Sequence, residues 1–126
     1  MSNFAINTEN APKAIGPYSQ AINSGELLFI SGQIPIDPFT GVFVPGGIEE
    51  QTKQVFKNLQ EILTVAELGV SDVIKTTIFL QNIKDFDVVN RLYSEFFTAP
   101  FPARSCVEVS ALPKGSLIEI EAVAGK

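Results

Sequence analysis

Apolar side chains recur at helical spacing between residues 48 and 66. They are Ile48, Val55, Phe56, Leu59, Ile62, Leu63 and Ala66. Charged residues occupy the opposite side, so this segment is predicted to form an amphipathic helix. Glu49 and Glu50 lie in its first turn, where the positive end of the helix dipole favours acidic side chains, and Gly69 favours an end shortly after Ala66.

A second apolar stripe follows Asp85 and ends before the prolines at positions 100 and 102. Its members are Phe86, Val89, Tyr93, Phe96 and Phe97. Aspartate accepts hydrogen bonds from the free backbone N–H groups at the start of a helix, so Asp85 is the expected N-cap. The pattern predicts a second amphipathic helix, and both helices then need a sheet to cover.

Segments typical of strands flank and separate the two predicted helices. The Ser24-Gly25 turn separates residues 18–23 from residues 26–33, which predicts a β-hairpin. Residues 73–80 are rich in β-branched and aromatic side chains, with mostly apolar groups on both faces. This pattern predicts a central strand that is covered on both sides.

The last two predicted strands, residues 104–110 and 117–124, alternate between apolar and polar positions. In the second strand, Ile118, Ile120, Ala122 and Ala124 form an apolar face suited to packing under the helices. Glu121 lies on the other face of that strand. In the first strand, Arg104 and Cys106 share one face. We expect the charged residues of both strands to point away from the helices.

These elements predict an α+β fold, a single domain over residues 1–126 with two helices packed on one face of a sheet. The other face stays uncovered, and a mean hydropathy of +0.22 is high for 126 residues if that face meets only water. Self-association would cover it. We therefore expect a symmetric oligomer whose interface encloses Arg104, Cys106 and Glu121.

The composition of the chain narrows its chemistry. There is no histidine and one cysteine, which excludes a Ser-His or Cys-His nucleophile pair, a cysteine-rich zinc site and an internal disulfide. Nine basic and 14 acidic residues give a formal charge of −5, so we expect no binding to nucleic acid or to a membrane. No apolar run approaches the length of about 20 residues that spans a bilayer, and residues 1–9 lack the features of a secretory signal. The expected location is cytoplasmic.

Six motifs resemble those of the RidA (YjgF-like) reactive-intermediate deaminases and follow one another in the family's order. They are AIGPYSQ (14–20), SGQIP (31–35), VIKTT (73–77), PARSCVEV (102–109), LPKG (112–115) and IEIEA (118–122). The resemblance covers nearly the whole chain. The stretch at residues 98–101 is shorter than in some relatives, and it directly precedes the PARSCVEV motif, which contains Arg104.

The resemblance implies a chorismate-mutase-like α+β fold with a mixed sheet. It further implies a homotrimer in which the other sheet face is turned inward and three sites lie between subunits. The short connection at residues 111–116 would allow the last two strands to form a hairpin. In the family, however, the strand at residues 73–80 lies between them.

Members of this family hydrolyse enamine and imine products of pyridoxal-phosphate-dependent serine and threonine dehydratases. The resemblance therefore implies deamination of 2-aminoacrylate and 2-aminocrotonate to 2-keto acids and ammonium, with small 2-imino and 2-keto acids as ligands. It implies no cofactor and no metal. The C=N carbon of a 2-imino acid is already electrophilic, so the reaction needs orientation, a proton donor and a water molecule.

The resemblance also assigns roles to individual residues. Arg104 would hold the substrate carboxylate in a bidentate pair, Glu121 would orient or activate the attacking water, and Tyr18 would donate a hydrogen bond. The remaining positions that match the family's pocket are Ser31, Gly32, Asn90 and Cys106.

Simpler structural roles compete with these assignments. Judged from its strand alone, Arg104 would more often form a surface ion pair, and Tyr18 would equally well anchor its own loop. Cys106 is more often a small buried residue than a reactive thiol. Glu119, two residues before Glu121, is expected on the solvated side of its strand.

Two other functions stay open at this point. A non-catalytic sensor would use the same arginine-centred cleft to bind 2-keto acids and other small carboxylates. Ribonuclease or translation-inhibitor activity, suggested for some relatives, is disfavoured by the charge of −5, the absence of histidine and the lack of a basic and aromatic surface.

Overall fold

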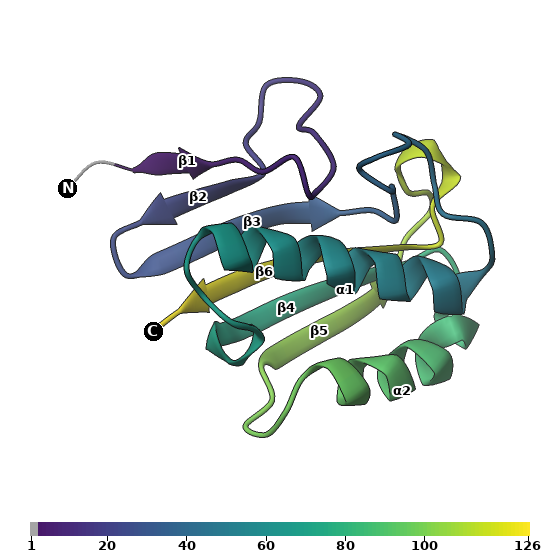
Figure 1. The fold of residues 1–126 in the computed structure, drawn as a ribbon. Coiled ribbons are helices and arrows are strands. Elements are labelled where there is room, and N and C mark those ends of the chain that lie inside the picture. Colours follow the sequence, from purple (N-terminus) through teal and green to yellow (C-terminus); the bar gives the residue numbers. More distant parts are fainter. Residues whose placement is uncertain (1–2) are drawn as a thin grey trace.

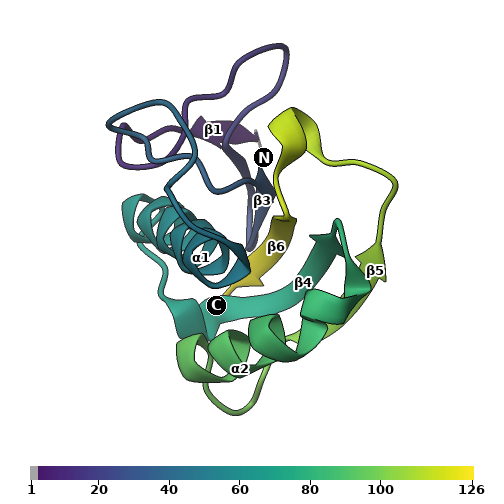
Figure 2. The ribbon, with the colours of Figure 1, turned by 90° about the vertical axis from the view of Figure 1, so that its right-hand side faces the viewer.

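Two helices cover one face of a six-stranded mixed sheet in the computed structural model, which describes residues 3–126 (Figures 1 and 2). The elements are β1 (Phe4–Ile6), β2 (Ala21–Ser24), β3 (Leu27–Gln33), α1 (Ile48–Val65), β4 (Val73–Leu80), α2 (Phe86–Phe96), β5 (Ala103–Glu108) and β6 (Ile118–Gly125). The strand order is β1-β2-β3-β6-β4-β5, and only the β4–β5 pairing is parallel. The helices, the mixed sheet and the position of β4 between β5 and β6 confirm the expected arrangement.

The core lies between the sheet and the two helices. Its fully buried apolar side chains include Val55, Ile62 and Leu63 of α1, Val89 of α2, Leu28 of β3, Ile78 and Leu80 of β4, and Ile118, Ile120 and Ala124 of β6. The helical and the alternating apolar positions of the sequence therefore face one another, which confirms that the apolar face of β6 packs under the helices.

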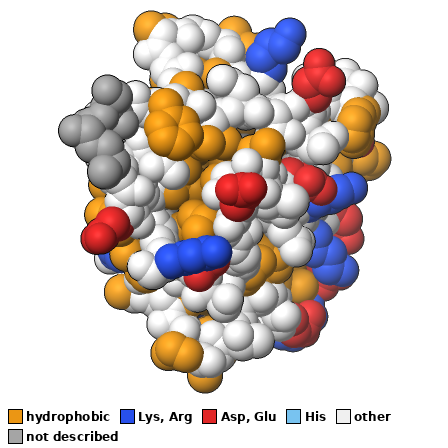
Figure 3. Space-filling view, turned by 60° about the vertical axis from the view of Figure 1, so that its left-hand side comes forward, with side chains coloured by type: hydrophobic (Ala, Val, Ile, Leu, Met, Phe, Trp, Pro, Cys, Tyr) orange, Lys and Arg blue, Asp and Glu red, His pale blue; other side chains and the backbone are white. Residues whose placement is uncertain are grey.

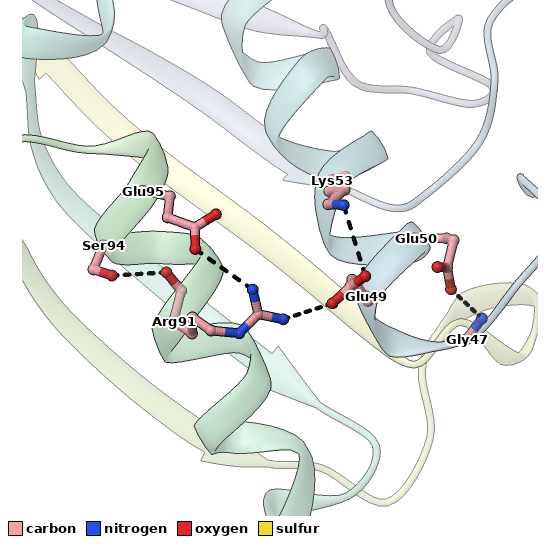
Figure 4. A network of polar contacts seen from close by, with 7 residues as sticks. All are labelled: Gly47, Glu49, Glu50, Lys53, Arg91, Ser94 and Glu95. Carbon is pink, nitrogen blue, oxygen red and sulfur yellow. Dashed lines mark hydrogen bonds and ion pairs between the residues drawn. The ribbon is translucent and has the colours of Figure 1, made fainter.

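A network of polar contacts on the outer surface links α1 to α2 (Figure 4). Arg91 of α2 pairs with Glu49 of α1 and, at 3.4 Å, with Glu95 one turn along its own helix. The Arg91 hydrogen bond and the nearby Lys53 charge lower the pKa of Glu49. The side chains of these ion pairs are largely exposed, so the pairs contribute little to the stability of the fold.

Two local expectations need correction, and the register at the start of β4 was not predicted. Asp85 precedes α2 but accepts no capping hydrogen bond, because a 3-10 turn (Ile83–Asp85) already runs into the helix, and Asn82 caps that turn through Lys84 N–H at 2.9 Å. The hairpin joins β2 and β3 as expected, but β2 begins at Ala21. A register shift between Val73 and Lys75 buries Val73 and leaves Ile74 exposed.

The second face of the sheet is open in a single chain. The expectation that β4 is covered on both sides is therefore wrong at this level, since Thr77 and Phe79 on this face are only half-buried. Phe29 of β3 and Val107 of β5 share the open face and are 47% and 44% exposed. Within residues 3–126, neither helix combines the length and the apolar character needed to cross a membrane.

Candidate functional site

Arg104 projects from the edge strand β5 toward the helices. Its backbone pairs with Thr76 of β4, whose side chain is fully buried on the helix face. Residues directly opposite each other in paired strands share a face, so Arg104 and Cys106 lie on that face as well. The expectation that the charged residues of both strands point away from the helices is therefore wrong for β5. An edge strand lets a long side chain turn inward and still reach water.

One face of α2 holds the Arg104 guanidinium. Asn90 Oδ1 accepts a hydrogen bond from Arg104 Nη1 at 2.8 Å. The guanidinium carbon lies 5.3 Å from the ring centre of Phe86 and 4.8 Å from that of Tyr93. No carboxylate between residues 3 and 126 forms an ion pair with Arg104. The surface ion pair that competed with the functional role is therefore absent from this part of the chain, and the exposed guanidinium keeps its charge.

Two hollows flank Arg104. One, of about 440 Å³, is lined by Asn90, Tyr93, Ser94, Phe101, Pro102 and Arg104. The other, of about 480 Å³, is lined by Ile83, Lys84, Phe86, Asp87, Arg104 and Cys106. Burial raises the pKa of the Cys106 thiol, and the Arg104 charge only partly opposes this effect. Cys106 is therefore a protonated thiol at neutral pH, which suits a pocket-lining group better than a nucleophile.

A third hollow, of about 600 Å³, opens on the helix-free face of the sheet. Its lining includes Tyr18, Ser31, Gly32, Glu119 and Glu121. The two glutamates project from β6 opposite Phe79 and Thr77 of β4, which places both on the open face. Lys13 and Lys114 also line this hollow, so it brings carboxylates, cations and hydroxyl groups together.

The hydroxyl groups of Tyr18 and Ser31 have different hydrogen-bonding capacity left for a ligand. Tyr18 Oη accepts a hydrogen bond from Ile15 N–H at 3.3 Å, so it anchors its own loop while its proton stays available. The Tyr18 side chain is 53% exposed. Ser31 Oγ donates to Ser19 O at 2.6 Å, which leaves Ser31 able only to accept.

Glu119 is the residue that the sequence analysis did not place in the site. It is half-buried, and burial raises the pKa of its carboxyl, with the neighbouring Glu121 charge raising it further. A Cβ atom on Gly32 would collide with the Glu119 carboxylate, so the glycine makes room for it. The expectation of a solvated Glu119 is therefore wrong. Two features of the sequence could have indicated this role: Glu119 shares a strand face with Glu121, and the Ser31-Gly32 motif supplies a glycine that leaves room for a neighbouring side chain.

The predicted site residues form two groups on opposite faces of one sheet. Arg104, Cys106 and Asn90 gather at the edge of β5, whereas Tyr18, Ser31, Gly32 and Glu121 gather at the open-face hollow. A single chain therefore does not bring the arginine and the carboxylates together. Within residues 3–126, no cluster of three or more His, Cys, Asp or Glu side chains is arranged to hold a metal ion.

Comparison with known proteins identifies the family. Residues 8–126 match the family described as Endoribonuclease L-PSP. The human 2-iminobutanoate/2-iminopropanoate deaminase is 52% identical over 119 residues, which cover 94% of this chain and 87% of the human protein. The chain belongs to the RidA/YjgF family. This confirms the resemblance drawn from the six motifs.

Other RidA/YjgF relatives extend the match to the whole fold. A RutC family protein from Pyrococcus horikoshii is 57% identical over 121 residues, which cover 96% of each chain. The crystal structure of YyfA, a Rid family protein of unknown function from Yersinia pestis, superposes with a TM-score of 0.96 at 52% identity, covering 99% of this chain and 100% of that one. The names of RidA/YjgF relatives thus include deaminases, an endoribonuclease family and proteins without an assigned activity.

Proposed function

We propose that this protein hydrolyses 2-imino acids and their enamine tautomers, such as 2-aminoacrylate and 2-aminocrotonate, to 2-keto acids and ammonium. The observation that carries this proposal is the Arg104 guanidinium, which is exposed, oriented by uncharged groups and free of any ion pair within residues 3–126. Such a group suits a small organic carboxylate. The deaminase name of the human relative, at 52% identity, supports the same substrate class.

The proposed site lies between subunits of a homotrimer. Arg104 and the Glu119–Glu121 pair are separated by the sheet within one chain, so a neighbouring chain has to supply one of the two groups. The open face also exposes Phe29 and Val107, whose burial against another copy would stabilise an assembly. The open face thus carries an incomplete set of site residues and exposed apolar side chains. Both features are expected of a surface that is covered by another copy of the chain.

The proposed reaction uses these groups in a fixed order. An enamine first becomes the protonated imine (iminium) when its β-carbon gains a proton. Arg104 holds the carboxylate, a water oxygen bonds to the C=N carbon, a carboxylate takes the water proton, and the nitrogen gains a proton. The C–N bond then breaks with its electron pair going to nitrogen, and the proton of the new hydroxyl passes to the departing ammonia, which gives the 2-keto acid and ammonium. In this proposal Tyr18, whose hydroxyl oxygen accepts a hydrogen bond from Ile15 N–H, uses its own proton to donate a hydrogen bond to the substrate or to the water.

Two carboxylates compete for the proton-transfer role. The family pattern gave Glu121, which is exposed and lines the open-face hollow. Glu119 lines the same hollow, and its raised pKa brings its proton exchange closer to neutral pH, where a general acid or base is most effective. We therefore assign the proton transfer to Glu119 and a water-orienting contact to Glu121.

The test generates the substrate in place. A threonine dehydratase produces 2-aminocrotonate from threonine, and formation of 2-ketobutyrate is followed with wild-type protein, Arg104→Ala and the matched control Arg91→Ala. Arg91 lies on the outer surface of α2 and lines none of the three hollows. We expect acceleration by wild type and Arg91→Ala, and a loss of roughly 2 to 4 kcal/mol, about 30- to 1000-fold, for Arg104→Ala. Equal rates with and without wild-type protein would refute the proposal.

The alternatives give different results in related assays. A carboxylate sensor would bind 2-ketobutyrate in calorimetry and leave imine hydrolysis at its spontaneous rate. A ribonuclease would need groups for binding and cleaving RNA, but the chain has no histidine and a charge of −5. On the surface shown in Figure 3, basic side chains are interspersed with acidic ones rather than gathered in a stripe.

A further inference from the structure

We propose that Phe86 and Tyr93 are positioning residues, which hold the Arg104 guanidinium for a substrate carboxylate without neutralising its charge. This inference rests on the proposed function and adds two residues that the sequence analysis placed only in the apolar stripe of α2. Their spacing of seven residues puts both rings on one face of the helix, with Asn90 between them. That face is the one that meets β5.

The two rings and the amide fix the guanidinium from different directions. Phe86 and Tyr93 lie within cation–π distance of its central carbon, at 5.3 and 4.8 Å, while Asn90 accepts a hydrogen bond from Nη1. Phe86 also lines the hollow that contains Cys106, and Tyr93 lines the hollow on the other side. These two rings, called the aromatic platform below, therefore lie between the two hollows that give access to Arg104.

Tyr93 is itself held rigidly. Its hydroxyl is hydrogen-bonded to Thr76 Oγ1 at 2.7 Å, and both groups are buried. Thr76 is the residue of β4 directly opposite Arg104 on β5. Phe56 and Phe97 pack against the Tyr93 ring, with ring centres 6.1 and 4.5 Å away. The ring beneath the guanidinium is thus tied to the same pair of strands that carries Arg104.

The chemical nature of the platform determines its effect on binding. A carboxylate in place of these rings would orient Arg104 equally well, but it would compete with the substrate carboxylate for the same charge. Aromatic faces attract the cation and leave its net charge unchanged. Because the substrate carboxylate takes no part in bond making, losing the platform weakens substrate and transition-state binding alike. Such a loss raises KM and leaves kcat largely unchanged.

The experiment compares Phe86→Leu with Phe96→Leu in the coupled deaminase assay. Phe96 is a matched control, because it lies on the same helix, is similarly half-buried and stacks on Phe56. Unlike Phe86 and Tyr93, it is not a ring that contacts the Arg104 guanidinium within the described residues. We expect Phe86→Leu to raise KM about tenfold, within the range of a partly desolvated cation–π contact, with kcat changed less than about threefold. Phe86→Tyr, which keeps the ring face, should restore most of the affinity.

The outcomes separate this inference from the proposed function. A loss of folded protein lowers kcat but not KM, so a destabilised variant is not mistaken for one with a weakened platform. If Arg104→Ala is impaired while Phe86→Leu keeps the KM of Phe96→Leu, the platform role is overturned and the deaminase proposal stands. If wild-type protein does not accelerate imine hydrolysis, both are overturned.

Discussion

An added negative charge beside Arg104 gives the sharpest test of how this guanidinium works. Asn90 Oδ1 lies 2.8 Å from Arg104 Nη1, so Asn90→Asp replaces a neutral acceptor with a carboxylate of nearly the same shape. The fold has room for the new side chain, because Asn90 is exposed on α2 and lines an open hollow. The substitution therefore changes charge far more than packing.

The size of the effect follows from Coulomb's law. Two carboxylates on different edges of one guanidinium lie about 6 Å apart, and at an effective dielectric constant of about 40 their repulsion is about 1.4 kcal/mol. That energy corresponds to about a tenfold loss of affinity for a substrate carboxylate. Asn90→Leu removes the hydrogen bond without adding charge, so we expect it to lose less affinity than Asn90→Asp.

Calorimetry with 2-ketobutyrate measures this difference directly for wild type, Asn90→Asp and Asn90→Leu. Raising the salt concentration from about 0.1 M to 1 M shortens the Debye length from about 10 to 3 Å, so the gap between the two variants should narrow. Equal affinities for wild type and Asn90→Asp at low salt would refute the claim that an uncompensated Arg104 charge binds the carboxylate.

Three further predictions test the open-face hollow and the helix surface. Gly32→Ala should leave the melting temperature nearly unchanged but lower deaminase activity, because the collision displaces only the end of the flexible Glu119 side chain. The pKa of Glu119 is higher in the folded protein than in the unfolded chain, so the protonated carboxyl stabilises the fold. This stabilisation is fully present below the unfolded pKa of about 4.3 and is lost as the pH rises through the pKa of the folded protein. In thermal melts, the melting temperature of Glu119→Gln should therefore rise relative to that of wild type as the pH is raised from about 4 to about 7. Arg91→Ala should leave the melting temperature almost unchanged, because its ion pairs with Glu49 and Glu95 are exposed.

Much of the fold follows from the periodicity of the sequence, because burial on one face imposes it. The helical stripe from Ile48 and the alternation in residues 118–124 correspond to α1 and β6 in the structure. The short strand β1 carries too few residues for a pattern to show. The register shift at Val73 depends on the contact with β6, which no local pattern records.

The order of the strands came from the family resemblance and not from the residues themselves. The connection at residues 111–116 is short enough for a hairpin, yet β4 lies between β5 and β6. β4 pairs in parallel with β5 and antiparallel with β6, and both pairings join residues far apart in the sequence. The length and turn residues of a connection restrict only how two strands that follow one another in the sequence can pair. They cannot select a strand order that depends on pairings between distant segments.

The candidate site shows the same limit at the level of single side chains. Alternation along β6 turns Glu119 and Glu121 away from the apolar face that packs under the helices, as the structure confirms. Along β5 it groups Arg104 with Cys106 but does not state which side of that strand faces the helices. That choice depends on the partner strand: β5 pairs with β4 so that Arg104 lies beside Thr76, and β6 pairs so that Glu121 lies beside Thr77. Because Thr76 and Thr77 are consecutive, they point to opposite faces, and so do the arginine and the glutamate. A reaction that uses both groups on one substrate therefore requires a second chain, which makes self-association part of the proposed chemistry and not only a means of covering an apolar surface.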